Sequence, residues 1–336
     1  MSDFPALPYP WQHDIWQSFY QQVLSERLPH AIMLAGPQGL GKRHFARVMA
    51  QYLLCQSPRS ESACGRCKSC ELNKAGTHPD YKTVAPEEPG KAIRVDDIRA
   101  LAETQGKTAQ QSGYKVVVLE PAEAMNTNAA NALLKTLEEP AEKTLLVLVS
   151  DAPSSVLPTI RSRCQIRSLA IPPAEQSLHW LTPLVSGTDY NAKELLAMAR
   201  GAPLRARDLV QGDALERQQG WLNDMGRLTL GQADPVVVAG DWQKGDVVEQ
   251  VNWLISWLHD LSCWQVGAPI PHIEQLDEAI RQSLRMMQPV LVHRFQEKLL
   301  GCKKRLASGA NPNKQLLLEE LLMDWGVLLK TRQSKP

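Results

Sequence analysis

The stretch Gly36-Pro37-Gln38-Gly39-Leu40-Gly41-Lys42-Arg43 follows an apolar run at residues 31–35 and indicates the fold of this chain. It matches the phosphate-binding pattern G-x-x-x-x-G-K-[ST] at every position except the last. Its three glycines let backbone N–H groups surround phosphate oxygens, and Lys42 can reach the β- and γ-phosphates. Arg43 stands where a Ser or Thr hydroxyl would bind Mg²⁺, and a guanidinium group offers only donors. The stretch therefore predicts a nucleotide-binding fold that keeps the phosphate cradle but does not hydrolyse nucleotide by itself.

The composition is that of a globular chain large enough for two or three domains. Of its 336 residues, 43% are hydrophobic and 22% are charged, and the net charge is +1 with a pI near 7.6. This balance gives no overall basic field for nucleic-acid binding. No apolar run reaches the roughly 18 residues of a membrane span, and the first residues do not resemble a secretory signal. We therefore expect a cytoplasmic protein with no membrane partner.

Strand-like and helical runs alternate through the first half of the chain. This alternation predicts a parallel α/β sheet, because each crossover between neighbouring parallel strands is usually a helix. The expected strands cover residues 31–35, 81–85, 115–119, 145–149 and 165–169, and the expected helices cover residues 42–55, 95–104 and 128–139.

The pattern changes at Ile171-Pro172-Pro173, which we interpret as a hinge. Short helices are expected after it, at residues 175–184, 191–200 and about 203–211, and the chain is helical beyond residue 212. The last apolar helix, at residues 313–330, fits either a core or an assembly interface. We therefore predict three domains: an α/β nucleotide-binding-like domain (residues 1–170), a helical lid (171–211) and a second helical domain (212–336).

Four of the seven cysteines lie close together between the first predicted helix and the second predicted strand. They are Cys55, Cys64, Cys67 and Cys70. In a reducing compartment, such cysteines favour metal binding or free thiols over disulfides. Four thiolates can complete a tetrahedral Zn²⁺ site with no open position, so we predict a structural zinc. Inert or redox-active thiols and an iron–sulfur cluster are the alternatives.

Two other segments bear on nucleotide hydrolysis. Hydrolysing domains of this type end the third strand with Asp-Glu, whereas here the strand at residues 115–119 runs into Glu120-Pro121. Glu120 can partly replace the metal-binding acid, but Pro121 has no side-chain proton acceptor. Arg163, in Ser162-Arg163-Cys164, lies between the fourth and fifth strands, where an arginine can reach the γ-phosphate of a neighbouring subunit. The alternative is an ordinary surface arginine in a loop.

These segments together resemble the delta-prime family of bacterial DNA polymerase III clamp-loader subunits. The resemblance covers about residues 25–170 and rests on the phosphate loop, the four cysteines, residues 75–80, residues 131–140 and Ser162-Arg163-Cys164. The string N-A-L-L-K-T-L-E-E-P at residues 131–140 is very specific to clamp-loader subunits. The resemblance implies a AAA+ core with a zinc-binding insertion at residues 55–70, followed by the small lid and a helical collar (oligomerisation) domain.

The resemblance also implies a role within a larger assembly. The family's pentamer opens a ring-shaped sliding clamp and places it on primed DNA, and its gamma/tau subunits hydrolyse ATP. The delta-prime subunit is implied to be a non-catalytic stator that presents Arg163, beside Ser162, to a neighbouring gamma/tau ATP site. The expected partners are gamma/tau and delta subunits, with the clamp and DNA reached through the assembly.

Departures from the ATP-hydrolysing subunits favour the delta-prime interpretation. Those subunits end the loop in Lys-[ST] and carry Gly-Ser-x-Arg in the lid. Here Leu204 takes the place of the phosphate-sensing arginine, and Arg205 comes one residue late, about 100° around a helix. The glycine pattern leaves ATP or ADP binding open. The alternatives are a self-sufficient AAA+ ATPase in which Glu120 holds Mg²⁺, and a zinc-bearing DNA-binding or thiol-exchange module, which the near-neutral charge disfavours.

Overall fold

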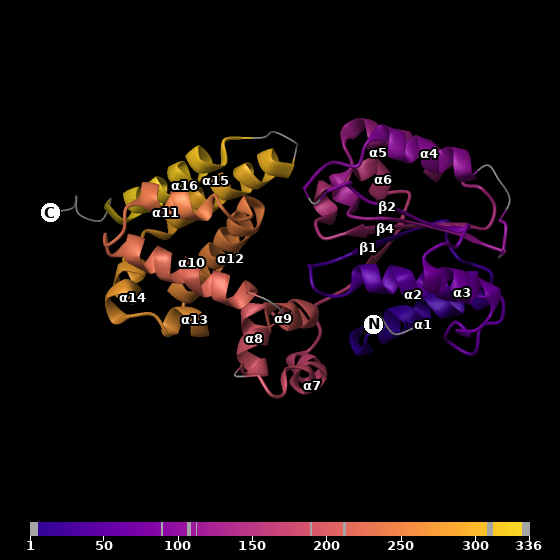
Figure 1. Cartoon of the computed structure of the whole chain (residues 1–336), viewed down its shortest axis with the longest axis horizontal. Helices are drawn as coiled ribbons and strands as arrows, with labels where there is room; N and C mark the ends of the chain where they lie inside the picture. Colours follow the sequence, from indigo (N-terminus) through magenta and orange to yellow (C-terminus); the bar gives the residue numbers. More distant parts are fainter. Residues whose placement is uncertain are drawn as a thin grey trace. The chain divides into compact units, whose positions relative to one another are not determined.

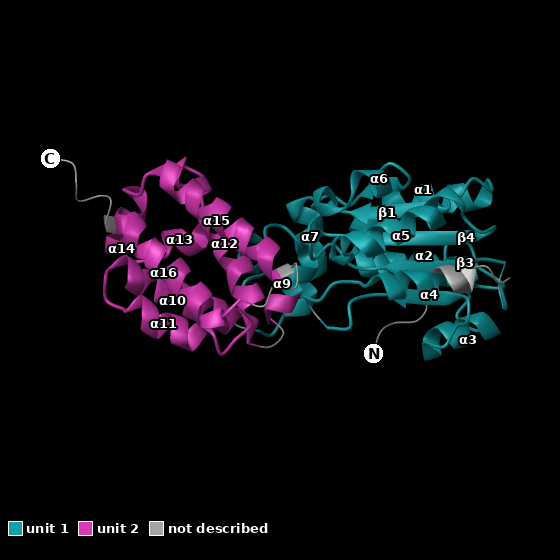
Figure 2. Ribbon diagram, turned by 90° about the horizontal axis from the view of Figure 1, so that it is seen from above, with its two compact units in different colours: residues 1–207 teal, residues 208–336 magenta. Residues whose placement is uncertain are grey.

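The chain divides into two compact units, residues 1–207 and residues 208–336 (Figure 2). The computed structural model describes residues 6–88, 90–105, 109–111, 113–188, 190–210, 213–307 and 312–330. The predicted boundary between residues 211 and 212 lies outside the described residues, and the division into three domains stays a prediction.

Unit 1 is built on a five-stranded parallel sheet with the strand order β2-β3-β4-β1-β5. The strands are β1 (Ala31–Ala35), β2 (Tyr81–Val84), β3 (Lys115–Leu119), β4 (Thr144–Ser150) and β5 (Gln165–Ser168). All five predicted strands are therefore confirmed, with ends that differ by at most one residue. Because the strands are parallel, their carboxyl ends share one edge, and the segments that follow β1, β3 and β4 meet there.

Helices cover both faces of this sheet (Figure 1). One face carries α1 (His13–Leu24), α2 (Lys42–Leu54) and α3 (Lys68–Ala75), and the other carries α4 (Val95–Gln105), α5 (Thr127–Glu138) and α6 (Pro158–Arg161). Side chains alternate along β1: Ile32 and Leu34 pack in the core with α1 and α2, whereas Met33 packs in the core with α4 and α5. Burial on both faces explains why the strands read as continuous apolar runs. Helices α1, α3 and α6 had not been predicted.

Short 3₁₀ turns and three further helices complete the α/β part of the chain. The turns are η1 (Pro10–Gln12), η2 (Ala122–Ala124) and η3 (Pro153–Ser155). The helices are α7 (Ala174–Val185), α8 (Ala192–Met198) and α9 (Pro203–Val210), which lie where the lid was predicted. No helix among the described residues is both long and apolar enough to span a membrane.

In its described residues, unit 2 consists of helices and turns around a tryptophan-rich core. The helices are α10 (Ala214–Thr229), α11 (Pro235–Trp242), α12 (Val247–Gln265), α13 (Pro271–Glu274), α14 (Glu278–Arg285), α15 (Pro289–Ala307) and α16 (Lys314–Lys330). Helix α12 packs against α15, and α11 packs against α16. Trp325 of α16 is fully buried, and its Nε1 donates to Oγ1 of Thr229 at 3.1 Å. The buried indoles contribute large apolar surfaces to the core between these helices.

Candidate functional site

The predicted phosphate loop connects β1 to α2 at the carboxyl edge of the sheet. Its path requires glycine at two points. A Cβ on Gly36 would lie 2.2 Å from the carbonyl oxygen of Leu169, and a Cβ on Gly39 would lie 2.8 Å from the Cβ of Arg205. Gly39 and Gly41 also have φ values of +83° and +80°, which other residues rarely adopt. The loop therefore has the close packing and the backbone turns of a phosphate cradle.

The Lys42 ammonium group is turned back onto oxygens of its own chain. Its Nζ donates to the carbonyl oxygens of Gly36 (2.7 Å) and Pro37 (2.6 Å) and lies 2.6 Å from Oδ1 of Asp151. The Lys42 side chain is only 3% exposed. Asp151 directly follows β4, the neighbour of β1, so sheet topology brings it to the loop. A phosphate group that bound Lys42 would compete with these three oxygen atoms.

Arg43 and Glu120 form an ion pair beside the loop, with Nε and Oε2 3.3 Å apart. Glu120 ends up here because it follows β3 directly. Burial raises the pKa of the Glu120 carboxyl above its usual value, Arg43 lowers this pKa, and Asp151 raises it further. Arg43, which stands where the metal-binding hydroxyl would be, therefore pairs with Glu120, the acid that could replace the usual metal ligand.

Glu123 does not extend this acidic group into a hydrolytic site. Its Oε1 accepts from the backbone N–H groups of Asp151 (2.9 Å) and Ala152 (3.2 Å). Its position fixes the backbone after β4, next to the aspartate that binds Lys42. Glu123 is thus a positioning residue in this structure.

The start of α9 closes over the phosphate loop from the predicted lid. The backbone N–H of Leu204 donates to the carbonyl oxygen of Gly39 at 3.1 Å. Leu204, at the position of the phosphate-sensing arginine, is buried at 8% exposure, where it has no charge to offer a phosphate. The adjoining Arg205 packs its Cβ against Gly39, as described above.

A group of aromatic side chains fastens the outer side of the loop. Tyr9 stacks on Trp11 with centroids 4.9 Å apart, and Trp180 of α7 meets both rings edge-on at 5.6 and 5.1 Å. The Trp11 Nε1 and the Gln12 Nε2 both donate to the carbonyl oxygen of Leu40, at 3.0 and 2.9 Å. These contacts join the N-terminal segment, the loop and α7, and no local sequence pattern had indicated them.

Ser162 and Arg163 lie in the short connection between helix α6 and strand β5. Arg163 donates to the Thr159 carbonyl oxygen through NH1 (2.9 Å) and pairs with Oε1 of Glu138 through NH2 (2.7 Å). Its side chain remains 37% exposed. Glu138 belongs to the N-A-L-L-K-T-L-E-E-P segment, so two stretches that resemble clamp-loader subunits contact each other here. These contacts of Arg163 are with α5 and α6, whereas Lys42 is held by its own loop and Asp151.

The four predicted metal ligands converge on one point. The Sγ atoms of Cys55, Cys64, Cys67 and Cys70 all lie within 4.8 Å of one another, and three of the pairs are separated by 3.7 to 3.9 Å. Four sulfurs that each lie about 2.3 Å from a tetrahedral zinc ion would be about 3.8 Å apart. This is the only such group among the described residues. The cluster therefore has the ligand number and spacing of a metal site.

Hydrogen bonds around the cysteines favour the thiolate form that binds metal. The backbone N–H groups of Cys64 and Cys67 donate to the sulfurs of Cys55 (3.2 Å) and Cys64 (3.3 Å). The N–H of Arg66 is the main reason that the pKa of Cys64 falls to about 6. Burial raises the pKa of Cys70, which is fully enclosed. A cation at the centre of the four sulfurs would offset the cost of burying the Cys70 thiolate.

His78 supports the cysteine cluster from outside. Its Nε2 lies 2.5 Å from Oγ of Ser69, which donates to the Leu54 carbonyl oxygen, and its Nδ1 accepts from the N–H of Asp80 at 3.1 Å. Burial lowers the pKa of His78, which is consistent with a neutral ring. It lies in the turn before β2 and connects α2, α3 and β2.

The parallel sheet of order β2-β3-β4-β1-β5, with a phosphate loop after β1 and the short helix α9 over that loop, gives this unit the fold of the AAA+ class of proteins. The comparisons with known proteins give the family. The model for "DNA polymerase III, delta subunit" matches residues 11–173, and that for "DNA polymerase III, delta subunit, C terminal" matches residues 213–326. Because relatives named subunit delta' are 39% and 31% identical over nearly the whole chain, the chain belongs to the family of DNA polymerase III delta-prime subunits.

Curated relatives extend over nearly the whole chain. The "DNA polymerase III subunit delta'" of Pseudomonas aeruginosa is 39% identical over 95% of this chain and 98% of its own length. The protein of the same name from Escherichia coli K12 is 31% identical over 94% of each chain. A gamma subunit-related protein from Thermotoga maritima aligns over 95% of this chain and 99% of its own at 17% identity, with a TM-score of 0.44.

Proposed function

We propose that this chain is a non-hydrolysing, cytoplasmic subunit of a DNA polymerase III clamp loader, which helps to place a sliding clamp on primed DNA. The relatives at 39% and 31% identity support the placement in that assembly. The observation that carries the non-hydrolysing role is the Arg43–Glu120 ion pair at 3.3 Å. A magnesium ion at this place would meet the Arg43 guanidinium group instead of a hydroxyl. The one carboxylate that could bind the ion, that of Glu120, is already paired with Arg43.

Lys42 supports the same conclusion from the other side of the loop. Its ammonium group contacts three oxygens of its own chain, so nucleotide binding would require these contacts to be broken. The self-sufficient ATPase is disfavoured because Glu120 is paired and Pro121 offers no base. The shape of the loop is compatible with binding of ATP or ADP. We propose that the chain does not hydrolyse a nucleotide bound there.

We further propose that Arg163 acts in trans on a neighbouring gamma/tau ATP site. Arg163 is partly exposed, and its guanidinium group is oriented by Glu138 and by the Thr159 carbonyl oxygen. A cation held in this way can approach a γ-phosphate presented by another subunit and stabilise charge in the transition state, an effect worth about 10³–10⁵ in rate at that site. Ser162, whose Oγ donates to the same Thr159 oxygen at 3.1 Å, fixes the turn that carries it.

The other parts of the chain have structural roles in this proposal. Cys55, Cys64, Cys67 and Cys70 would hold a Zn²⁺ ion, which would stabilise the insertion between α2 and β2 and supply no chemistry. Unit 2 would be the collar that joins the subunit to gamma/tau and delta partners. Several exposed apolar side chains on α11 and α16 support this role: Val236, Val237, Leu316, Met323 and Val327.

The test is reconstitution with purified gamma/tau and delta subunits, clamp and primed DNA. The isolated chain should show negligible Mg-dependent ATP hydrolysis, and the assembly with Arg163→Ala should load clamps at least about tenfold more slowly. Arg167→Ala, a neighbouring arginine on β5, serves as the matched control and should leave loading near the unaltered level. Equal loading by the Arg163→Ala and unaltered assemblies would contradict the proposal that Arg163 acts as an arginine finger. Vigorous ATP turnover by the isolated chain would contradict the proposed non-hydrolysing role.

A further inference from the structure

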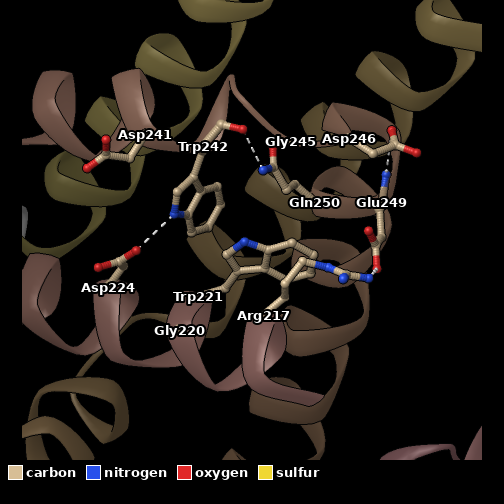
Figure 3. A pocket seen from close by; sticks show the side chains of 10 residues that line it. All are labelled: Arg217, Gly220, Trp221, Asp224, Asp241, Trp242, Gly245, Asp246, Glu249 and Gln250. Atoms are coloured by element: carbon tan, nitrogen blue, oxygen red, sulfur yellow. Dashed lines mark hydrogen bonds and ion pairs between the residues drawn. The ribbon is translucent and has the colours of Figure 1, made fainter. Parts of the chain in front are cut away.

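Unit 2 contains a cleft of about 500 Å³ that lies between α10, α11 and the start of α12 (Figure 3). Two indoles form its walls: Trp221 of α10 and Trp242 of α11, with centroids 6.0 Å apart and planes inclined by 52°. Four carboxylates surround them, those of Asp224, Asp241, Asp246 and Glu249. The volume falls in the range of about 300–1,000 Å³ that is typical of pockets for small organic groups. The cleft therefore combines aromatic walls with an acidic lining.

The side-chain oxygen of Gln250, in the lining of this cleft, is a hydrogen-bond acceptor that receives no hydrogen bond from the described residues. The side chain is 2% exposed, and its Nε2 donates to the Trp242 carbonyl oxygen at 2.6 Å. Its Oε1 is buried and has no hydrogen-bond partner among the described residues. Buried polar atoms are nearly always hydrogen-bonded, so an unmatched acceptor at a cleft wall points to a ligand that donates. Figure 3 shows the carboxamide beside Trp242 at one end of the cleft.

The carboxylates are arranged for an extended cation and not for a metal ion. Asp224 accepts from Nε1 of Trp242 at 3.0 Å, and Glu249 pairs with Arg217 at 3.2 Å, on different sides of the cleft (Figure 3). The acidic groups do not converge as metal ligands, because among the described residues only the four cysteines do so. A ligand that fits must be broad enough to contact several of these oxygens at once.

The charge around the cleft favours a cation. Four carboxylates and a single cation, Arg217, line it. Arg227 and Lys244 reach Asp224 (3.6 Å) and Asp241 (2.8 Å), and even with them one negative charge stays in excess. Three of the four carboxylates thus have a cation partner, and the remaining negative charge belongs to Asp246, whose Oδ1 caps the start of α12. A positively charged group that entered the cleft would be attracted by this one net negative charge.

We propose that this cleft binds the arginine side chain of a partner protein. A guanidinium group is planar, stacks on indoles, and carries five N–H donors that can meet Oε1 of Gln250 and a carboxylate together. The same unit already shows such a contact, because the guanidinium carbon of Arg285 lies 4.9 Å from the ring centroid of Trp264. This site is independent of the Lys42 loop and of Arg163, and it gives unit 2 a specific attachment point.

The test follows the tryptophan indole N–H signals of the full-length, ¹⁵N-labelled chain by NMR. Trp221→Phe and Trp242→Phe identify the two relevant signals. The probe is acetyl-Gly-Arg-Gly-amide, and its matched control contains citrulline, which has nearly the same shape without the charge. We expect the arginine peptide to shift both signals to saturation with a Kd on the order of 1 mM, and the citrulline peptide to bind at least about fivefold more weakly.

Two variants locate the binding. Glu249→Gln removes one lining charge at a partly exposed side chain and should weaken the arginine peptide about threefold or more. Gln250→Met removes the unmatched acceptor and should weaken it similarly, and circular dichroism checks that this variant folds; if it does not fold, Glu249→Gln decides. Glu297→Gln, an exposed residue of α15 outside the cleft, should change nothing.

Three results would overturn the proposal. The first is no shift of either indole signal at about 10 mM peptide. The second is equal binding of the citrulline peptide, which would make the cleft a site for neutral groups. The third is binding that Glu249→Gln leaves unchanged, which would place the peptide elsewhere.

Discussion

Arg43 and Glu120 are joined by an ion pair at the carboxyl edge of the sheet, with Nε and Oε2 3.3 Å apart. Arg43 is the second residue of α2, and Glu120 follows β3, so the contact exists only because the sheet brings these two segments together. Each residue departs from a hydrolytic motif, and the two departures compensate each other's charge. The relationship explains how an acid can remain partly buried beside a phosphate loop that lacks its metal ligand.

Replacing this arginine should restore affinity for nucleotide. In Arg43→Thr, a hydroxyl becomes available to Mg²⁺ and Glu120 loses its partner, so we expect Mg-ATP to bind at least about tenfold more tightly than to the unaltered chain. Hydrolysis should stay negligible, because Pro121 still offers no base. Isothermal titration calorimetry with Mg-ATP measures the affinity.

The control for this change is the double variant Lys42→Ala, Arg43→Thr. Removing the ammonium group should abolish the gain, since Lys42 is the residue that would contact the phosphates. If Arg43→Thr binds Mg-ATP no better than the unaltered chain, the ion pair is not what prevents metal binding.

The raised pKa of Glu120 predicts a pH dependence of stability. Because burial raises this pKa above 4.5, the folded chain keeps a proton on the carboxyl at pH values where the unfolded chain has lost it. The contribution of Glu120 to the free energy of unfolding therefore declines as the pH rises from about 4.5 through the higher, folded pKa. Glu120→Gln lacks this decline, so its stability relative to the unaltered chain should increase as the pH rises from about 4 to 7.

Urea unfolding of both chains across this pH range measures the effect. Glu139→Gln, an exposed carboxylate of the same unit, is the control and should show little such trend. A stability difference for Glu120→Gln that stays constant with pH, or that decreases as the pH rises, would contradict the raised pKa.

The sequence predicted the sheet well because its strands are buried on both faces. Continuous apolar runs, such as residues 116–119 in β3 and 145–149 in β4, leave a strong local signal, and the glycine spacing of the loop does the same. The cysteine cluster was also predictable, since four ligands within a short segment can reach one centre. Helix α3 was missed because the cysteine-containing insertion has few apolar residues and no clear helical period.

Contacts between distant segments were not predictable in the same way. Asp151 binds Lys42 only because β4 lies next to β1, and the sequence gives no sign of that pairing at either residue. Trp11 and Trp180 meet edge-on although they are separated by the entire sheet in sequence. An acidic residue directly after a buried strand, as at Asp151, is the one local signal that could have identified a loop contact.

Arg163 and Glu138 allow the proposed finger to be tested for geometry as well as for charge. Arg163→Lys keeps the charge but loses the planar fork, so the reconstituted assembly should lose nearly as much ATP turnover as with Arg163→Ala. Glu138→Gln keeps an acceptor for NH2 of Arg163 and should retain most of the turnover. A steady-state ATPase assay with clamp and primed DNA compares the variants. Full activity of Arg163→Lys would indicate a general electrostatic role, in contrast to a positioned guanidinium group.

The cysteine cluster should bind about one zinc ion per chain, and the insertion should depend on it. Cys64→Ser removes one of four thiolates, so we expect zinc to be lost. We also expect backbone amides from Cys55 to His78 to exchange with solvent at least about tenfold faster, because the same cysteines form most of the small core of this segment. Elemental analysis and hydrogen exchange measure the two effects. The affinity for zinc should also fall as the pH is lowered, since the cysteine thiols must lose their protons to bind metal. Cys263→Ser, outside the cluster, should retain the metal, and zinc retained by Cys64→Ser or lost by Cys263→Ser would contradict this assignment.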